Sequence, residues 1–294
     1  MRLFYNLRVS FLIAIALAQA VTVVFNGFFL KVMLDGLGTS ISPREYIPLS
    51  AIGSLSNLVF PFGGGLGVKV VYLRVLHGLD VARFAIRSTG LYSVVFCANS
   101  LAGLFLMLDR WHTPFGMTVC LFLGSVALLT TVSITTPVWR FCHLKFRFLG
   151  SSAGRIFEEF HEIGRLGSDL LKFFTVLFGN IIIFGLATYI EFAALGSGAG
   201  ADFSVSFRDS VLLSVIGSFA LLVSITPAGL GVRESISIVV GKCMGISEAQ
   251  VLAVCLLDRA VNVVVLAAMG GVSYYVLQNR LKGGRAACGP AEKD

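Results

Sequence analysis

Long apolar segments recur along this chain, and they restrict its fold more than any other feature. Five runs reach the roughly 20 residues that a helix needs to cross the hydrocarbon core of a bilayer. They cover 10–30, 84–108, 115–139, 170–195 and 249–277. Only 13% of the residues are charged, whereas an ordinary soluble domain carries about 25%. The sequence therefore predicts an all-α polytopic protein of the cell membrane, with a single integral membrane domain over 1–294.

Two further apolar stretches, near 48–62 and 210–225, are short, and each runs into a break rich in Gly and Pro. Interrupted backbone is tolerated at membrane depth only where it is buried in protein or lines a water-filled cavity. We therefore expect two re-entrant helix pairs around a central cavity. Six residues are expected to form their loops: Pro61, Gly65, Gly67, Pro227, Gly229 and Gly231.

The two interrupted stretches are similar to each other. REYIPLSAIGSLSNLVFPFGGGLGVK (44–69) aligns without a gap with RDSVLLSVIGSFALLVSITPAGLGVR (208–233), and 12 of the 26 positions are identical. Interrupted apolar segments in corresponding places of two halves are typical of carriers built from inverted repeats. The duplication predicts four parts: repeat 1 over about 10–108, a connecting span and amphipathic helix over 115–169, repeat 2 over about 170–277, and a basic tail over 278–294.

The distribution of Lys and Arg predicts the orientation of the chain, because cytoplasmic loops carry an excess of both. With two re-entrant pairs and five spans, an external N-terminus places the basic stretch 140–165 and the basic tail in the cytoplasm. The two repeats then have opposite orientations in the membrane, and their loops enter it from opposite sides.

Four ionisable residues in repeat 2 are candidate substrate-binding residues, because a charge within a span costs about 2.5 to 3.5 kcal/mol. Arg233 and Glu234 begin the helix after the second break, where free backbone N–H groups and a guanidinium favour an anion such as a lipid phosphate. Asp258 and Arg259 lie in the last span, and we expect Asp258 to neutralise Arg233 or Arg259 in the empty state. Alternatively, all four only form a buried ion-pair network between two helices.

In repeat 1, Lys69 and Arg74 on the matching helix are the further candidate substrate-binding residues, and Lys69 is expected to take the part of Arg233. Arg74, Arg83 and Arg87 all have side chains long enough to reach the membrane surface, and snorkelling is the simpler expectation for them. Glu191 is expected near a membrane edge, where it would be solvated. Three polar residues within spans are weaker candidates: Asn26, Asn180 and Glu191.

Other kinds of site lack support in the sequence. The six Cys and four His residues show neither a disulfide framework nor the spacing of a metal site. No catalytic constellation and no cofactor motif is visible, and no basic and aromatic platform for nucleic acid. The net charge of +7 fits loops that face anionic lipid headgroups. We expect no metal, no cofactor and no nucleic acid.

Both interrupted regions carry a resemblance to a known family. TPAGLGVRES (226–235) followed by MGISEAQVLAVCLLDRAVNVVV (244–265) resembles the C-terminal signature of the lysylphosphatidylglycerol synthase transmembrane-region family. SPREYIPLSAIGSLSNLVFPFGGGLGVKVVYLRVLHGLDVARF (42–84) is similar to that family's first signature. Six residues match the second motif: Pro227, Gly229, Gly231, Arg233, Glu234 and Arg259. Pro61, Gly65 and Lys69 match the first.

The resemblance implies lipid translocation. In bifunctional relatives the module flips aminoacylated phosphatidylglycerol, and other relatives are tied to hopanoid and polyprenyl-linked glycolipid traffic. This chain departs from the family pattern in repeat 1, where Leu66 replaces an acid and Leu91 and Tyr92 replace a common Glu-Arg. The first span usual in the family is not apparent before residue 10, either because it is lost or because the chain starts further upstream.

The leading hypothesis is a flippase or carrier that holds an anionic lipid headgroup, or a lipid-linked substrate, in the cavity between the two loops. A second hypothesis is an intramembrane enzyme in which Glu234 or Asp258 acts with a histidine on a lipid-linked substrate. A third is an accessory subunit of envelope glycolipid assembly, with a partner protein. A homodimer is compatible with all three.

Overall fold

The computed structural model describes residues 8–60, 64–110, 112–135, 167–199, 205–219 and 231–287. Over these residues every regular element is a helix, which confirms the predicted all-α class. The long helices are α1 (Val9–Asp35), α4 (Val81–Met107), α5 (Pro114–Thr135), α8 (Gly167–Ala199) and α11 (Glu248–Ala287). The short helices are α2 (Pro43–Val59), α3 (Gly64–His77), α9 (Phe207–Ser218) and α10 (Val232–Cys243).

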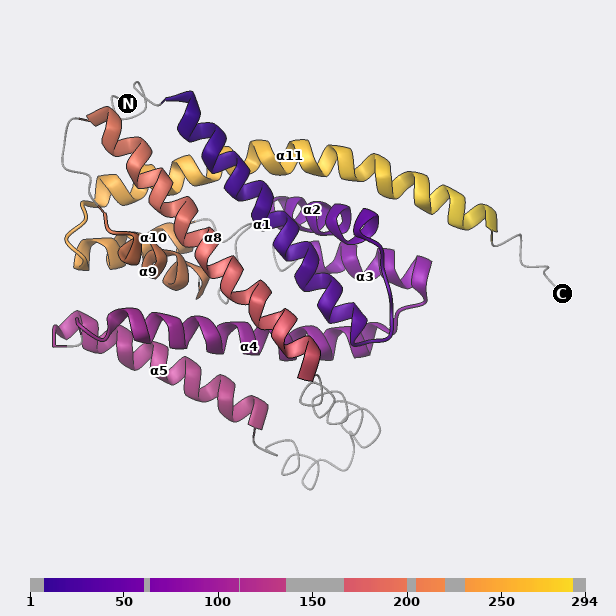
Figure 1. Ribbon diagram of the computed structural model, residues 1–294, viewed down its shortest axis with the longest axis horizontal. Coiled ribbons are helices and arrows are strands. Elements are labelled where there is room, and N and C mark those ends of the chain that lie inside the picture. Colours follow the sequence, from indigo (N-terminus) through magenta and orange to yellow (C-terminus); the bar gives the residue numbers. More distant parts are fainter. Residues whose placement is uncertain are drawn as a thin grey trace.

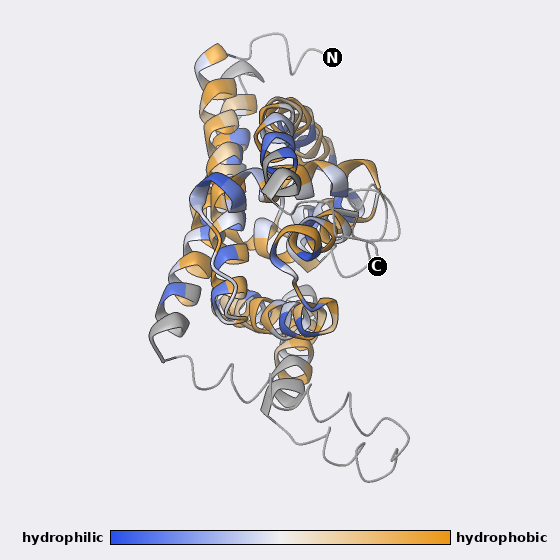
Figure 2. Ribbon diagram, turned by 90° about the vertical axis from the view of Figure 1, so that its right-hand side faces the viewer, coloured by the Kyte–Doolittle hydropathy of each residue, from blue (hydrophilic) through white to orange (hydrophobic). Residues whose placement is uncertain are grey.

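Four of the long helices are long and apolar enough to cross a membrane, in agreement with four of the five predicted spans. They are α1, α4, the Phe174–Gly196 part of α8 and the Glu248–Lys282 part of α11. Hydrophobic residues cover most of these helices in Figure 2. In α5 the apolar part of the described residues is shorter, Gly116–Leu129, so the fifth span stays a prediction.

The two predicted pairs of short helices are present, and the sequence explains where they begin. At the start of α2 the Glu45 carboxylate accepts a hydrogen bond from the Ser42 backbone N–H at 3.2 Å, and Pro43 supplies a favourable first residue. At the start of α9 the Ser206 hydroxyl accepts from the Asp209 N–H at 3.1 Å. Both pairs are interrupted as expected, since α2 ends at Val59 and α9 at Ser218.

The six residues expected to form the loops do not share one place. Pro61, Pro227 and Gly229 lie outside the described residues. Gly231 lies just before α10 with φ of 83°, a backbone conformation that glycine adopts without strain. The prediction that Gly65 and Gly67 form the loop is wrong, because both belong to the first turn of α3 and not to the break before it.

Corresponding helices of the two predicted repeats make corresponding contacts. The first short helix of each repeat packs against the last long helix of the other, α2 on α11 and α9 on α4, while α1 lies beside α8. In Figure 1, α1 and α8 run in opposite directions, and so do α4 and α11. This arrangement brings the start of α10 against the first third of α11, where Asp258 and Arg259 lie.

Two apolar clusters fix these helices. One joins α1, α2, α3 and α4 through side chains such as Leu30, Leu49 and Leu73. The other joins α1, α8, α9 and α11, with Ile15 and Phe192 among its most buried members. The predicted amphipathic helix within 115–169 lies mostly outside the described residues. The helix α11 continues beyond the predicted end of its span, into the segment expected to be a basic tail.

Candidate functional site

The first turn of α10 places two of the predicted site residues. Arg233 and Glu234 follow Gly231, and Glu234 Oε2 accepts a hydrogen bond from the Gly231 backbone N–H at 2.8 Å. The Glu234 carboxylate therefore occupies a position at the helix N-terminus that an external anion would otherwise favour. The anion-binding capacity of this helix start consequently depends on the arginines.

Two ion pairs join α10 to α11. Arg233 Nη1 lies 2.9 Å from Asp258 Oδ2, and Arg259 Nε pairs with Glu234 Oε1. The structure thus brings all four charged candidates of repeat 2 together. Of the two partners expected for Asp258, it places Arg233 beside the carboxylate. In a low-dielectric site such pairing avoids an isolated buried charge.

Asp258 has a further partner on α1. Gln19 Nε2 donates a hydrogen bond to Asp258 Oδ1, so both carboxylate oxygens are bound from different helices. Sequence reasoning missed Gln19, although an amide inside the apolar run 10–30 is an available signal. The first span of repeat 1 therefore contributes directly to the charged cluster of repeat 2.

Glu191 on α8 corrects an expectation. It was expected near a membrane edge and solvated, yet only 2% of its surface is exposed. Its carboxyl group interacts electrostatically with Asp258 and Arg233, and its Oε1 has no hydrogen-bond partner among the described residues. We use the name "repeat 2 cluster" for six residues: Gln19, Glu191, Arg233, Glu234, Asp258 and Arg259.

Exposure differs within the repeat 2 cluster. The Arg233 side chain is 37% exposed, whereas that of its partner Asp258 is 9% exposed. The Arg259 and Glu234 side chains are mostly buried. Of the two arginines, Arg233 therefore has the more accessible side chain, and its guanidinium is already paired with the Asp258 carboxylate.

The matching cation of repeat 1 has a different environment. Lys69 makes no ion pair or hydrogen bond with any residue that the structure describes. Its stem lies against α2, since a methyl group added at Gly53 would come within 2.6 Å of Lys69 Cε. Gly217, at the equivalent position of α9, lies below Arg233, whose Nε would be 3.8 Å from such a methyl group. In both repeats the cation therefore lies over a glycine of the first short helix.

Gly65 explains how closely α2 and α3 pack. A methyl group there would lie 2.0 Å from the Gly53 carbonyl oxygen, so only glycine fits. The Gly65 N–H donates to Asn57 Oδ1 at 2.8 Å, which secures the first turn of α3. Arg74, the other candidate of repeat 1, lies in the last turn of α3 and is exposed.

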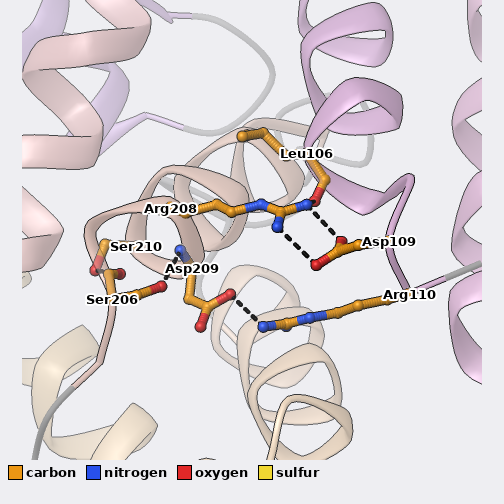
Figure 3. A network of polar contacts seen from close by, with 7 residues as sticks. All are labelled: Leu106, Asp109, Arg110, Ser206, Arg208, Asp209 and Ser210. Atoms are coloured by element: carbon orange, nitrogen blue, oxygen red, sulfur yellow. Dashed lines mark hydrogen bonds and ion pairs between the residues drawn. The ribbon is translucent and has the colours of Figure 1, made fainter.

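A charged junction fixes the start of α9 (Figure 3). Arg208 Nη1 donates to Asp109 Oδ2 at 2.6 Å, and Arg110 Nη2 lies 2.8 Å from Asp209 Oδ1. The hydrogen bond from Arg208 lowers the pKa of Asp109. These four residues, which we call the Asp209 junction, connect repeat 2 to the end of α4 in repeat 1.

A second junction fixes the start of α2. Glu45 Oε1 lies 3.0 Å from Arg280 Nη1 on α11 and 3.5 Å from His77 Nε2 at the end of α3. We call these three residues the Glu45 junction. Glu45 and Asp209 occupy equivalent positions of the two repeats, so each junction joins the acid at the start of one repeat's first short helix to the other repeat.

The remaining candidates lie apart from these clusters. Arg87, expected to reach the membrane surface, is instead 1% exposed, and its guanidinium packs against Gly36 at the end of α1. Asn26 and Asn180 are partly buried, and no contact of either with the repeat 2 cluster is recorded among the described residues. Arg87 is thus buried, whereas Arg83 is exposed as expected.

Comparison with known proteins agrees with the resemblance seen in the sequence. The family described as "Lysylphosphatidylglycerol synthase TM region" matches residues 1–270, which is most of the chain. No curated protein and no solved structure matches this chain.

Proposed function

This chain belongs to the lysylphosphatidylglycerol synthase TM-region family, and on that premise we propose that it moves an anionic lipid headgroup across the membrane. The observation that carries the proposal is the Arg233–Asp258 pair. It places an arginine with a partly exposed side chain at the start of a helix that follows a break, inside a chain with several membrane-spanning helices. A guanidinium binds phosphate oxygens in a bidentate manner, which makes a lipid phosphate a suitable ligand.

The binding step is an exchange of partners. In the empty site Asp258 neutralises Arg233, so neither charge is left alone in a low-dielectric environment. A headgroup phosphate replaces the Asp258 carboxylate at the Arg233 guanidinium. Arg259 stays with Glu234, which caps α10 and holds its first turn in place. Lys69 is the matching cation of repeat 1, and the acyl chains of the lipid remain in the bilayer.

Movement of the headgroup between leaflets requires two alternative arrangements of the protein. We propose that the two repeats are inverted and rock against each other, as in other carriers with this plan. The opposite directions of α1 and α8, and of α4 and α11, support this proposal (Figure 1). The Asp209 junction lies at the end of α4 and the Glu45 junction near the end of α11, so these contacts lie at opposite ends of the molecule and are suited to close one side each.

A flipping assay in reconstituted vesicles tests the proposal. Labelled phosphatidylglycerol is compared with labelled phosphatidylcholine, and an impermeant quencher reports how much label reaches the outer leaflet. We expect Arg233→Gln to slow phosphatidylglycerol flipping by at least about tenfold, which corresponds to roughly 1.4 kcal/mol. Lys242→Gln is the matched control, because Lys242 is a cation on the same helix that is 70% exposed and pairs with Glu248. Equal rates for the two variants would refute the proposal.

A further inference from the structure

Glu191 is the most deeply buried carboxyl group in the part of the chain that the structure describes. It lies on α8, within the stretch Phe174–Gly196 that is apolar enough to span a membrane. An ionised carboxylate in such a position is costly unless a cation or hydrogen-bond donors compensate it. The surroundings of Glu191 therefore decide its protonation state.

The charges around Glu191 do not provide a free cation. The helices α1, α9 and α11 pack against α8. From α1 the nearby polar group is the neutral Gln19 amide, which already donates to Asp258. The charged residues of α9, Arg208 and Asp209, take part in the Asp209 junction at its start. These helices leave Glu191 without a partner of its own.

The helices α10 and α11 supply the remaining charges. Arg233 pairs with Asp258, and Arg259 pairs with Glu234. Cys255, also on α11, contributes a thiol that interacts with Arg233. Two cations are thus matched by two carboxylates, and the described residues leave no counter-charge for Glu191, the third carboxylate. If it were ionised, the repeat 2 cluster would carry an uncompensated negative charge.

The position of Glu191 beside Asp258 supplies a further argument. The helices α8 and α11, which carry the two residues, pack against each other, and the two carboxyl groups interact electrostatically. Two ionised carboxylates have only acceptors and repel each other, whereas one proton gives the pair a donor. Glu191 Oε1 also has no other partner among the described residues, which is expensive for an ionised group and less so for a neutral one.

We propose that Glu191 and Asp258 form a proton-binding pair, which holds one proton at neutral pH while Asp258 is bound to Arg233. The proton comes from water and is shared within the pair, so neither residue titrates independently. The pair is a ligand site for a proton, separate from the Arg233 group that is proposed to hold the lipid.

One consequence rests on the proposed lipid transport. When a headgroup phosphate takes Arg233 from Asp258, the released carboxylate loses its cation beside Glu191. The pair then takes up a second proton from water, and the phosphate charge that enters is balanced. Headgroup binding and proton uptake are coupled in this way, and a proton gradient becomes able to drive the lipid.

Infrared spectroscopy of the protein in lipid nanodiscs tests the proton site directly. A neutral carboxylic acid has a C=O stretch that an ionised carboxylate lacks, and this band is followed against pH. We expect the band in the wild type at pH 7 and its loss in Glu191→Gln. Glu45→Gln is the matched control and should keep the band, because Glu45 is also buried but has Ser42, His77 and Arg280 as partners.

Asp258→Asn adds a test of the pair. It removes the counter-charge of Arg233, so Glu191 should ionise beside that arginine and the band should again be lost. The proposal is overturned if the wild type shows no band at pH 7, if Glu191→Gln leaves the band unchanged, or if the band survives in Asp258→Asn. The readout does not depend on flipping, so a protein with the band that moves no lipid would refute only the proposed transport.

Discussion

The second short helices of the two repeats, α3 and α10, share a backbone arrangement but differ in the charged groups around their cation. Each begins after a break and carries a cation, Lys69 or Arg233, over a glycine of the preceding short helix. Around Arg233 the partners are carboxylates, whereas the positions corresponding to Glu234 and Glu191 hold Val70 and Gly27 in repeat 1. The backbone plan is therefore shared, but only repeat 2 carries the means to neutralise its cation.

The long helices show the same difference. The helices α4 and α11 each follow a glycine with positive φ, Gly78 and Gly245. When the two helices are aligned on these glycines, Leu91 and Tyr92 stand where repeat 2 has Asp258 and Arg259. The same two residues depart from the family pattern. Lys69, which has no carboxylate partner among the described residues, and Arg233, which is paired with Asp258, are expected to respond differently to substitution.

The largest difference in stability between the two repeats is expected when the cation of each repeat is replaced in turn. Arg233→Gln leaves Asp258 buried without its cation, so stability is lost whether the carboxylate stays charged or takes up a proton, although Gln19 still donates to it. We expect a loss of about 2 to 3 kcal/mol of stability, at or just below the lower limit for breaking a buried pair. Lys69→Gln orphans no carboxylate and should change stability by about 1 kcal/mol or less. Thermal unfolding in nanodiscs measures both variants against the wild type.

A double variant separates pairing from the general effect of mutating α10. Arg233→Gln with Asp258→Asn removes both charges, so most of the lost stability should return, as it does when both members of a buried pair are neutralised. If the double variant is as unstable as Arg233→Gln alone, the ion pair is not the cause. Equal losses for Lys69→Gln and Arg233→Gln would remove the difference between the two repeats.

The sequence predicted the parts of this comparison that are local. Spans, breaks and helix starts follow from apolar length, glycine and proline content and capping residues, and the match between 44–69 and 208–233 located both cations. The depth of a side chain is not local. Glu191 is buried because α1, α9 and α11 pack against α8. Arg87 is buried against Gly36 at the end of α1, and Gln19 matters because α1 crosses α11 at Asp258. Only the tertiary packing of the helices determines these neighbours.

An intermediate effect is expected from the glycines that hold the short helices together. Gly65→Ala would place a methyl group 2.0 Å from the Gly53 carbonyl oxygen, which belongs to the backbone and cannot rotate away. We expect a loss of about 1 to 3 kcal/mol, the usual range for an overpacked core. Gly217→Ala is the matched change in repeat 2, where the nearest atoms of the described residues lie 3.8 Å away, so it should be tolerated.

Unfolding midpoints of the two alanine variants check this prediction. The result also bears on function. If Gly217→Ala is tolerated, the surface of α9 beneath Arg233 is unchanged, whereas Gly65→Ala displaces α3 and with it Lys69. If Gly217→Ala proves as damaging as Gly65→Ala, α9 and α10 pack as closely as α2 and α3, and the two repeats differ less than the structure indicates.

The smallest effect is expected at the Asp209 junction, because Asp109 is 52% exposed there, whereas Glu45 in the other junction is 9% exposed. The hydrogen bond from Arg208 lowers the pKa of Asp109 below its ordinary value of 3.8. Its contribution to stability is therefore fully present above that value and is lost as the pH falls through the lowered pKa. Asp109→Asn should be slightly less stable than the wild type at pH 7, and the difference should vanish as the pH falls below 3.8. Unfolding followed over this pH range measures the gap. A gap that persists at low pH would show that Asp109 stabilises the junction by something other than its charge.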